Sequence, residues 1–310
     1  MRSKSYSMSW RGRCAARVAL EVSFVLWLAA CASAPPPAEV YATTASKPKA
    51  QSAESVAPAS PDQLSARYAK GDRKFDGLQL RGAELSAANL GAASFRGADL
   101  SGADLRAAML ESSDFSEADL RGAHLDGAKL TGASLRGARL AKATLVDAVL
   151  WTADLSSAVL DGARLDQANL QHADLSSAQL RSASLKLTLL ETAVLRGADL
   201  TGANLSQATL PDADLEGAKL AQANLSQADF GRAHLRDADL SGALLCRTNF
   251  LSTDLASAKL EGARYGKTTP LPPGFDAKAK GAIEDACCDQ TNFEQACSWK
   301  PPIKDRGGAE

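Results

Sequence analysis

The chain has 310 residues, of which 45% are hydrophobic but only 5% are aromatic, and its formal net charge at pH 7 is −1. Proteins that bind nucleic acid through general electrostatic attraction carry an excess of Lys and Arg. The balance here excludes that class, and the segment 75–265 alone carries 24 acidic against 18 basic residues. We therefore expect a mildly acidic surface and no nucleic-acid partner.

Residues 1–30 have the composition of a targeting signal. A basic start precedes a short apolar core at residues 22–30, far below the ~20 residues of a membrane-spanning helix. The core ends in Leu28-Ala29-Ala30-Cys31, which resembles the lipobox of bacterial lipoproteins. This resemblance implies a lipoprotein signal peptide cleaved before Cys31 and a lipid on Cys31. The mature chain would then be anchored in the bacterial cell envelope, with the outer membrane, on its periplasmic or surface side, as the favoured location.

An ordinary secretory signal cleaved after Ala34 is the alternative, although Pro35 is unfavourable directly after a cleavage site. Glu21 is unusual in either signal, and Met8 is an alternative start to Met1. Residues 31–61 are rich in Ala, Pro, Ser and Thr without apolar periodicity, which predicts a disordered tether. Residues 62–74 are predicted to form a short helical cap on the segment that follows.

From residue 75 to residue 265 an apolar side chain recurs every five residues. Every position divisible by five from Leu80 to Leu260 is Leu or Phe. Neither an α-helix, which turns about 100° per residue, nor a strand, whose side chains alternate faces, places such residues on one side. Ala stands two positions before almost every one, and the polar exceptions are all small: Ser113, Thr188, Thr248 and Thr253.

A backbone that turns once in every five residues brings all these side chains inward. The Ala two positions earlier shares the inward face, since residues i and i+2 of an extended segment point the same way. Glycine is frequent just before this Ala, where a turn favours a residue without Cβ: Gly97, Gly102, Gly122, Gly132 and Gly197. The pattern predicts an all-β solenoid.

The repeating unit, as in Ala98-Asp99-Leu100 and Ala203-Asn204-Leu205, resembles the A(D/N)LXX unit of the pentapeptide-repeat family. The resemblance covers about 190 of the 310 residues. It implies a right-handed quadrilateral β-helix with four units per coil and short helical caps. Nine or ten coils stacked at ~4.8 Å would make a rod about 45 Å long.

Residues 266–299 are predicted to be a C-terminal cap containing a cysteine cluster, and residues 300–310 a disordered tail. Pro272-Pro273-Gly274-Phe275 resembles the exit segment of pentapeptide-repeat proteins. We expect a short helix from Asp276 to Ala286, followed by one more repeat unit at residues 291–295.

Four cysteines remain after the N-terminal segment: Cys246, Cys287, Cys288 and Cys297. In an exported protein an even number suggests disulfides. The hypothesis is that Cys297 pairs with one of the adjacent cysteines and Cys246 with the other, although the sequence does not choose among three pairings. Inert thiols are the alternative. A metal site is disfavoured, because no His accompanies the cluster.

Other polar candidates lie on the outward positions of the repeat. In a coil of twenty residues one column would contain Asp114, Asp154, Asp174, Asp214 and Asp254. Such an acidic ladder could bind a basic partner or cations, but the family's preference for Asp before Leu produces ladders by itself. His124, His172 and His234 fall on different columns, so surface positions are expected for them.

Apolar residues at outward positions indicate a candidate interaction surface, because clustered exposed apolar groups can mark a partner site. They are Met109, Val149, Trp151, Val159, Leu187, Leu189 and Val194. Met109, Val149 and Leu189 would share one column at two-coil spacing. The expected partner is another protein or a second copy of the chain.

The leading functional interpretation is a non-enzymatic, lipid-anchored envelope protein that presents a rigid rod for protein–protein interaction. No catalytic arrangement, cofactor site or metal site is predicted. Two alternatives remain. One is the topoisomerase-binding activity of some relatives, in which an acidic rod imitates DNA; the other is thiol exchange by the C-terminal cysteines, although no Cys-x-x-Cys is present.

Overall fold

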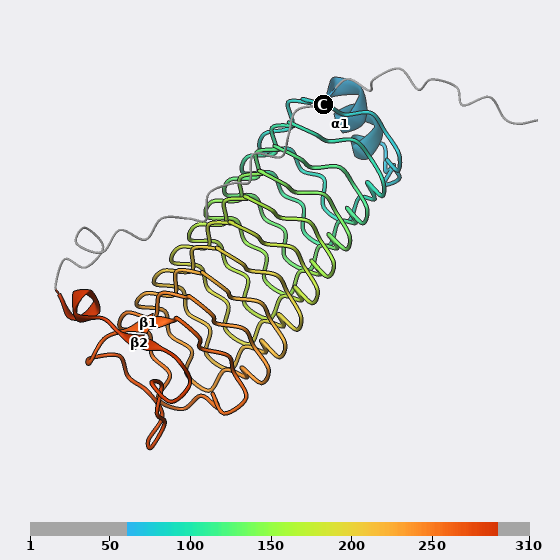
Figure 1. The fold of residues 1–310 in the computed structure, drawn as a ribbon. Helices are drawn as coiled ribbons and strands as arrows, with labels where there is room; N and C mark the ends of the chain where they lie inside the picture. Colours follow the sequence, from blue (N-terminus) through green and yellow to red (C-terminus); the bar gives the residue numbers. More distant parts are fainter. Residues whose placement is uncertain (1–60, 291–310) are drawn as a thin grey trace, which may run out of the picture. The chain divides into compact units, whose positions relative to one another are not determined.

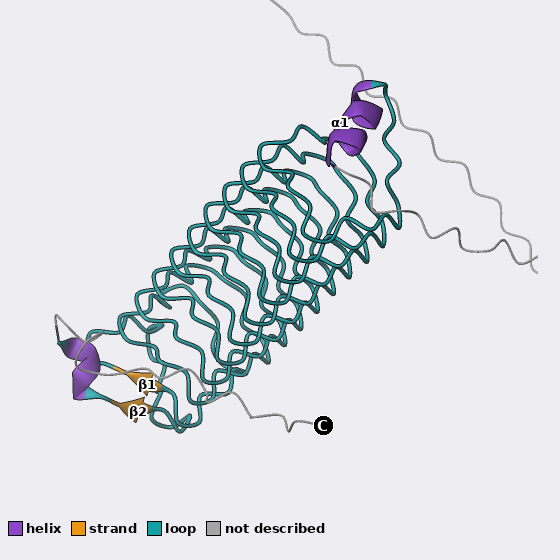
Figure 2. Cartoon of the chain, turned by 90° about the horizontal axis from the view of Figure 1, so that it is seen from above, coloured by secondary structure: helices purple, strands orange, loops and turns teal. Residues whose placement is uncertain are grey.

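The computed structural model describes residues 61–290, which all fall within one compact unit. It begins with helix α1 (Pro61–Ala69) and ends with two short paired strands, β1 (Arg264–Tyr265) and β2 (Ile283–Glu284), and a 3-10 helix η1 (Ala286–Asp289). Between them the chain winds as a stack of coils, with α1 at one end and β1 and β2 at the other (Figures 1 and 2).

Each coil contains twenty residues. Parallel bridges join residues twenty apart, from Lys74 with Ser94 to Leu244 with Arg264. The backbone N–H of Leu100 donates to the carbonyl of Asp119 in the next coil, at 2.8 Å, and the N–H of Leu80 in the coil before donates in the same direction to the carbonyl of Asp99, at 2.7 Å. Backbone polar groups are thus satisfied between coils, as buried ones must be. Four five-residue units per coil give the rod four faces.

A tight turn separates each face from the next. At one corner the N–H of Ala103 donates to the carbonyl of Leu100 at 3.0 Å, and Gly102 has a φ of +67°. The glycines singled out in the sequence all have positive φ, which confirms the reason given for them. Many other corners place a non-glycine residue in the same left-handed conformation, including Ala107 at +55° and Leu187 at +59°.

The interior is filled by the side chains that recur every five residues. The residues at every fifth position from Leu80 to Leu260 are buried, as predicted, and so are the alanines two positions before them, except Ala88, which is half-buried. Phenylalanine rings stack between coils, with centroids 5.3 Å apart for Phe75 and Phe95 and 5.2 Å for Phe230 and Phe250. The buried hydroxyls that stand in place of Ala donate to backbone carbonyls, for example Thr188 to Leu165 at 2.9 Å. Each of these buried polar groups therefore has a hydrogen-bond partner.

Helix α1 covers the first coil and overlaps the segment 62–74 that was predicted as the N-terminal cap. Leu64 is completely buried, and the Tyr68 hydroxyl donates to the carbonyl of Gly91 at 2.9 Å. The Arg67 guanidinium lies 5.0 Å from the centre of the Phe75 ring. These contacts close the open end of the core, as solenoids require.

The predicted helix from Asp276 to Ala286 is wrong. The Asp276 carboxylate accepts the N–H of Ala279, but the single turn ends at Gly281, whose φ is +80°. The chain then forms β2, and the N–H of Ile283 donates to the carbonyl of Ala263 at 2.7 Å. Pairing with the exposed edge of the last coil replaces the local helix, because an unpaired edge leaves backbone groups unsatisfied.

No helix within residues 61–290 is long and apolar enough to cross a membrane. The predicted signal peptide, Cys31, most of the tether, the extra repeat unit at 291–295 and the tail lie outside the described residues.

Candidate interaction face and C-terminal disulfide

One of the four faces of the rod carries most of the exposed apolar side chains. Its central column is a chain of bridged residues: Asn89, Met109, Lys129, Val149, Asn169, Leu189, Thr209, Asp229 and Asn249. We call this column, with the turn residues on both of its edges, the apolar face. The predicted placement of Met109, Val149 and Leu189 in one column is confirmed.

Large apolar side chains on this face are open to solvent. Trp151 on one edge is 44% exposed and Leu187 on the other is 41% exposed, while Met109 and Leu189 in the column are 36% and 38% exposed. Val149 is half-buried. The Trp151 ring meets His172 edge-on with centroids 5.7 Å apart, so its position is fixed by a neighbouring coil.

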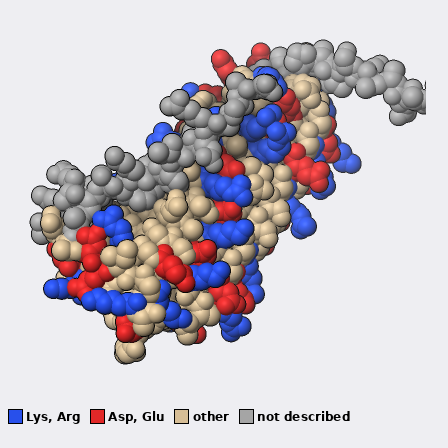
Figure 3. Space-filling view, in the orientation of Figure 1, with Lys and Arg blue, Asp and Glu red and all other residues tan. Residues whose placement is uncertain are grey.

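The central column of the apolar face is also poor in charge. Its central column contains two charged residues, Lys129 and Asp229. The column beginning at Gln79, in contrast, contains Asp99, Asp119, Arg139, Asp199, Lys219, Asp239 and Lys259. Figure 3 shows a side of the molecule on which basic and acidic side chains are interspersed. The apolar face therefore differs in chemistry from the rest of the rod.

Two of the predicted interaction residues lie elsewhere. Val159 is bridged to Arg139 and Gln179, and Val194 is bridged to Asp174 and Asp214, so each lies on a different face. Both are half-buried. The grouping of these two valines with the other candidates is wrong, because outward position in a unit does not specify which of four faces a residue occupies.

Sequence reasoning also missed a member of the apolar face. Leu251, which is 54% exposed, occupies the same turn position as Trp151 one hundred residues later, which is five coils along the same edge. Counting residues modulo twenty, rather than modulo five, would have found it.

The acidic ladder has a local structural role. Asp114, Asp154, Asp174, Asp214 and Asp254 share one column, but Ser134, Val194 and His234 interrupt it. Each of these carboxylates accepts the backbone N–H two residues further on, for example Ser176 N–H to Asp174 at 2.8 Å. Asn169 and Asn204 make the same bond. Capping the turn explains the preference for Asp or Asn before Leu.

Hydrogen bonds also lower the pKa of two turn carboxylates, Asp104 and Asp114. The side-chain bond from Arg106, with a smaller opposing effect of burial, lowers the pKa of Asp104 to about 2. At Asp114 burial raises the pKa, but bonds from Ser116 and an ion pair with Arg96 outweigh it, so the net pKa is lowered. Both of these carboxylates are ionised at neutral pH and already accept a backbone N–H within their own turn.

The three histidines do not come together at one site. His124, His172 and His234 are exposed on separate columns. Within the described part of the chain, no group of three or more His, Cys, Asp or Glu side chains is arranged to hold a metal ion.

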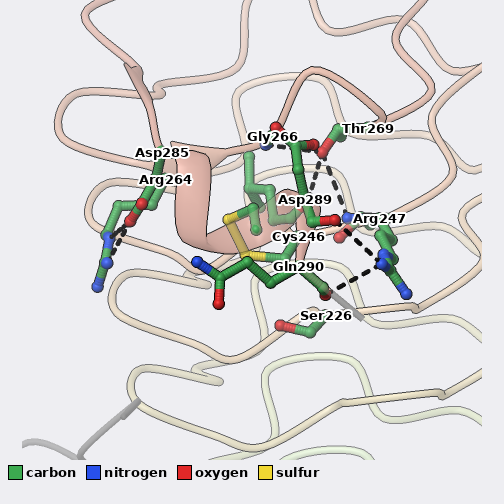
Figure 4. The surroundings of a disulfide bond; sticks show 12 residues. Ser226, Cys246, Arg247, Arg264, Gly266, Thr269, Asp285, Asp289 and Gln290 are labelled. Atoms are coloured by element: carbon green, nitrogen blue, oxygen red, sulfur yellow. Dashed lines mark hydrogen bonds and ion pairs between the residues drawn. A yellow bond between two sulfur atoms is a disulfide. The ribbon is translucent and has the colours of Figure 1, made fainter. Parts of the chain in front are cut away.

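A disulfide between Cys246 and Cys288 joins the last part of the repeat to η1, 42 residues later (Figure 4). Both cysteines are completely buried. The pairing leaves Cys287 and Cys297 as the two remaining cysteines of the cluster, and Cys297 lies outside the described residues.

Polar contacts hold the same segment around the disulfide. Asp289 accepts the N–H groups of Lys267 and Thr268 at 3.1 and 3.0 Å, and the backbone bond from Thr268 is the main reason that its pKa is lowered. Arg264 forms an ion pair with Asp285. A Cβ on Gly266 would lie 2.5 Å from a carboxylate oxygen of Asp289, so only glycine permits this close approach. Together with the disulfide, these contacts close the C-terminal end of the core.

Comparison with known proteins agrees with this architecture. The family profile for pentapeptide repeats matches in eight copies, over residues 74–111, 113–151, 153–186, 188–227 and 228–264. The chain therefore belongs to the pentapeptide-repeat family, whose members form right-handed quadrilateral β-helices and generally act as non-enzymatic structural or interaction proteins.

Solved structures of this family are similar to the chain. HetL from the cyanobacterium Nostoc sp. strain PCC 7120, a protein involved in the regulation of heterocyst differentiation, is 36% identical, with 69% of this chain and 98% of that one covered and a TM-score of 0.32. A protein of the Arabidopsis thaliana thylakoid lumen is 37% identical over 38% and 71%, with a TM-score of 0.14. QnrB1, a plasmid-mediated fluoroquinolone resistance protein, is 21% identical over 62% and 92%, with a TM-score of 0.31. No curated protein matches the chain.

Proposed function

We propose that this protein is a non-enzymatic, lipid-anchored protein of the bacterial cell envelope that presents a rigid β-helical rod for protein–protein interaction. The observation that carries the interaction part is the apolar face. Trp151, Leu187 and Leu189 are exposed together on the side of the rod whose central column has the fewest charges. Soluble monomeric proteins rarely leave such clusters uncovered.

The rod is suited to a binding role that depends on shape. Its outward side chains are displayed at fixed intervals, because every coil is hydrogen-bonded to the next and the interior is filled by Leu and Ala. A partner that binds such a surface does not have to order it, and this saves conformational entropy on association. Trp151 is the expected anchor, since Trp is enriched among residues that dominate binding energy.

The interaction is tested by placing a photo-cross-linking amino acid at Trp151 in the living cell. We expect cross-linked protein species from this position and none from Val159, a matched control on another face. Absence of cross-linked species from position 151, and likewise from positions 149 and 189, would refute a role for the apolar face in protein–protein interaction.

The anchor is supported by the lipobox resemblance at residues 28–31 and by the 29 residues between Cys31 and Pro61, where α1 begins. A tether of this length would separate the rod from a membrane surface. We expect Cys31→Ser to release the protein from the membrane fraction, while Cys14→Ser leaves it there. Mass spectrometry of a mature N-terminus that carries no lipid on Cys31 would contradict the anchor.

Neither alternative function is favoured by a particular observation. Thiol exchange requires access of a thiolate to a sulfur atom, but Cys246 and Cys288 are completely buried. Imitation of DNA requires a continuous acidic surface, whereas the acidic column is interrupted and Arg196 pairs with Asp214 within it.

A further inference from the structure

We propose that two copies of this chain pack against each other through their apolar faces in an antiparallel arrangement, with Lys129 of each copy opposite Asp229 of the other. This inference rests on the proposed function and identifies one partner of the apolar face as a second copy of the chain.

The orientation follows from the two charges of the central column. In a parallel pair related by a twofold axis along the rods, each coil meets its own counterpart. Lys129 would then face Lys129, and Asp229 would face Asp229. Like charges directly opposite each other are destabilising. In an antiparallel pair the order of coils is reversed, so opposite charges can meet.

The register follows from the spacing of these charges. Lys129 and Asp229 are five coils apart, and the point midway between them lies between Asn169 and Leu189. A twofold axis at this point brings Lys129 opposite the partner's Asp229 and, by symmetry, Asp229 opposite the partner's Lys129. This point also lies near the middle of the repeat segment 75–265, so the two rods overlap along most of their length.

The same register sets the apolar residues of the column against uncharged polar residues of the second copy. In the column it places Val149 opposite Thr209, Asn169 opposite Leu189 and Met109 opposite Asn249. On the Trp151 edge it places Trp151 opposite Pro211, a pair of apolar surfaces, and Leu251 opposite Glu111. No like charges meet along the central column. A symmetric contact of this kind, in which one patch binds itself, is the usual basis of homodimers.

Both charged groups are available for the contact. Among the ion pairs formed by residues 61–290, none involves Lys129 or Asp229. Lys129 is exposed. The Asp229 carboxylate accepts from the Gly231 N–H and the Asn249 amide, but both bonds go to Oδ1. The other oxygen, Oδ2, is the one that would accept from the ammonium group of Lys129 in the second copy.

The available area suits a reversible dimer. From Met109 to Asn249 the column spans seven coil steps, or about 34 Å at ~4.8 Å each. Five residues at ~3.3 Å make each face about 16 Å wide. The product is roughly 550 Å² per copy, near the lower limit for stable interfaces of about 1,200 Å² in total. We therefore expect a dimer that forms at moderate concentration and dissociates on dilution.

A zero-length cross-link tests the register directly. Carbodiimide joins a Lys amine to a carboxylate only when the two are in contact. Lys129 and Asp229 of one chain are about 24 Å apart, so a Lys129–Asp229 cross-linked peptide can form only between copies. In carbodiimide-treated full-length protein we expect this peptide by mass spectrometry, together with a covalent dimer. Dimers linked at other residues but not at this pair would overturn the proposed register.

A charge exchange tests the contact independently. Two differently tagged full-length copies are expressed together, and one tag is used to capture the other. Lys129→Asp or Asp229→Lys, introduced in both copies, should reduce co-capture by roughly tenfold, since each creates two like-charge contacts. The combined variant Lys129→Asp/Asp229→Lys should restore it. The control Lys219→Asp, an exposed Lys at the same unit position on another face, should leave co-capture unchanged.

Failure of this inference is distinguishable from failure of the proposed function. If the parent protein shows neither co-capture nor the Lys129–Asp229 peptide, self-pairing through the apolar face is refuted. Cross-links from Trp151 to a different protein would still support the interaction role. If the combined variant fails to restore co-capture while its unfolding temperature is unchanged, the antiparallel register is refuted.

Discussion

Two adjacent alanines lie at one corner of the rod, and replacing each by glycine is expected to change the stability in opposite directions. Ala107 is exposed and has a φ of +55°, whereas its neighbour Ala108 points inward and is completely buried. An L-residue in the left-handed region costs about 1–2 kcal/mol, and glycine removes this cost at the first position. At the second position glycine only removes a buried methyl group.

The magnitudes follow from these environments. At either position, the additional freedom of glycine in the unfolded chain costs about 0.5–1 kcal/mol. For Ala107→Gly the relief of strain exceeds this cost, so the free energy of unfolding should rise by roughly 0.5–1 kcal/mol. For Ala108→Gly the lost burial of one methyl, about 0.8 kcal/mol, adds to the cost. The free energy of unfolding should then fall by roughly 1.3–1.8 kcal/mol.

Chemical unfolding followed by circular dichroism measures both effects. The two variants should shift the midpoint in opposite directions with the same dependence on denaturant concentration. Equal destabilisation by both substitutions would refute the assignment of strain to the corners. It would also remove the explanation for the frequent glycines at these positions of the repeat.

Three further predictions concern the C-terminal closure and the turn carboxylates. Replacing Cys246 and Cys288 together by Ser should lower the free energy of unfolding by about 2–4 kcal/mol, because the bond closes a long loop. Gly266→Ala should lower it by about 1–3 kcal/mol and increase hydrogen exchange at residues 286–289, since the new Cβ would lie 2.8 Å from the Cβ of Cys288. The Arg106 hydrogen bond lowers the pKa of Asp104 to about 2, so its carboxylate stabilises the fold above pH ~4, and this contribution is lost between pH ~4 and ~2. Asp104→Asn should therefore flatten the fall of the unfolding temperature in this range.

Each of these predictions has a matched control. A reducing agent should reproduce the effect of the double cysteine substitution in the parent protein and have little effect in the variant. Gly91→Ala should be nearly neutral, because its Cβ would lie 3.4 Å from the closest neighbouring atom. Asn204→Asp keeps the acceptor for the Ser206 N–H but should add acid sensitivity. If neither Asp104→Asn nor Asn204→Asp changes how the unfolding temperature falls with acid, the role assigned to the turn carboxylates is contradicted.

The sequence by itself determined which residues form the interior and the class of the fold. A period of five is incompatible with the geometry of an isolated helix or strand, so the inward position of Leu100 or Ala98 follows from spacing alone. Local hydrogen bonding also explains the recurrent Asp or Asn, since the turn that each one caps lies within two residues of it.

Only the tertiary structure decided which outward residues lie together. Val159 and Val194 match the other candidates in position within the unit, but the stacking of coils places them on different faces. The closure after Tyr265 was predicted only in part: the hypothesis that Cys246 pairs with one of the two adjacent cysteines is confirmed, but the choice of Cys288 and the formation of β2 depend on contacts between segments far apart in the chain. A five-residue pattern specifies whether each side chain points inward or outward. Which outward side chains are neighbours on the surface depends on how the coils stack.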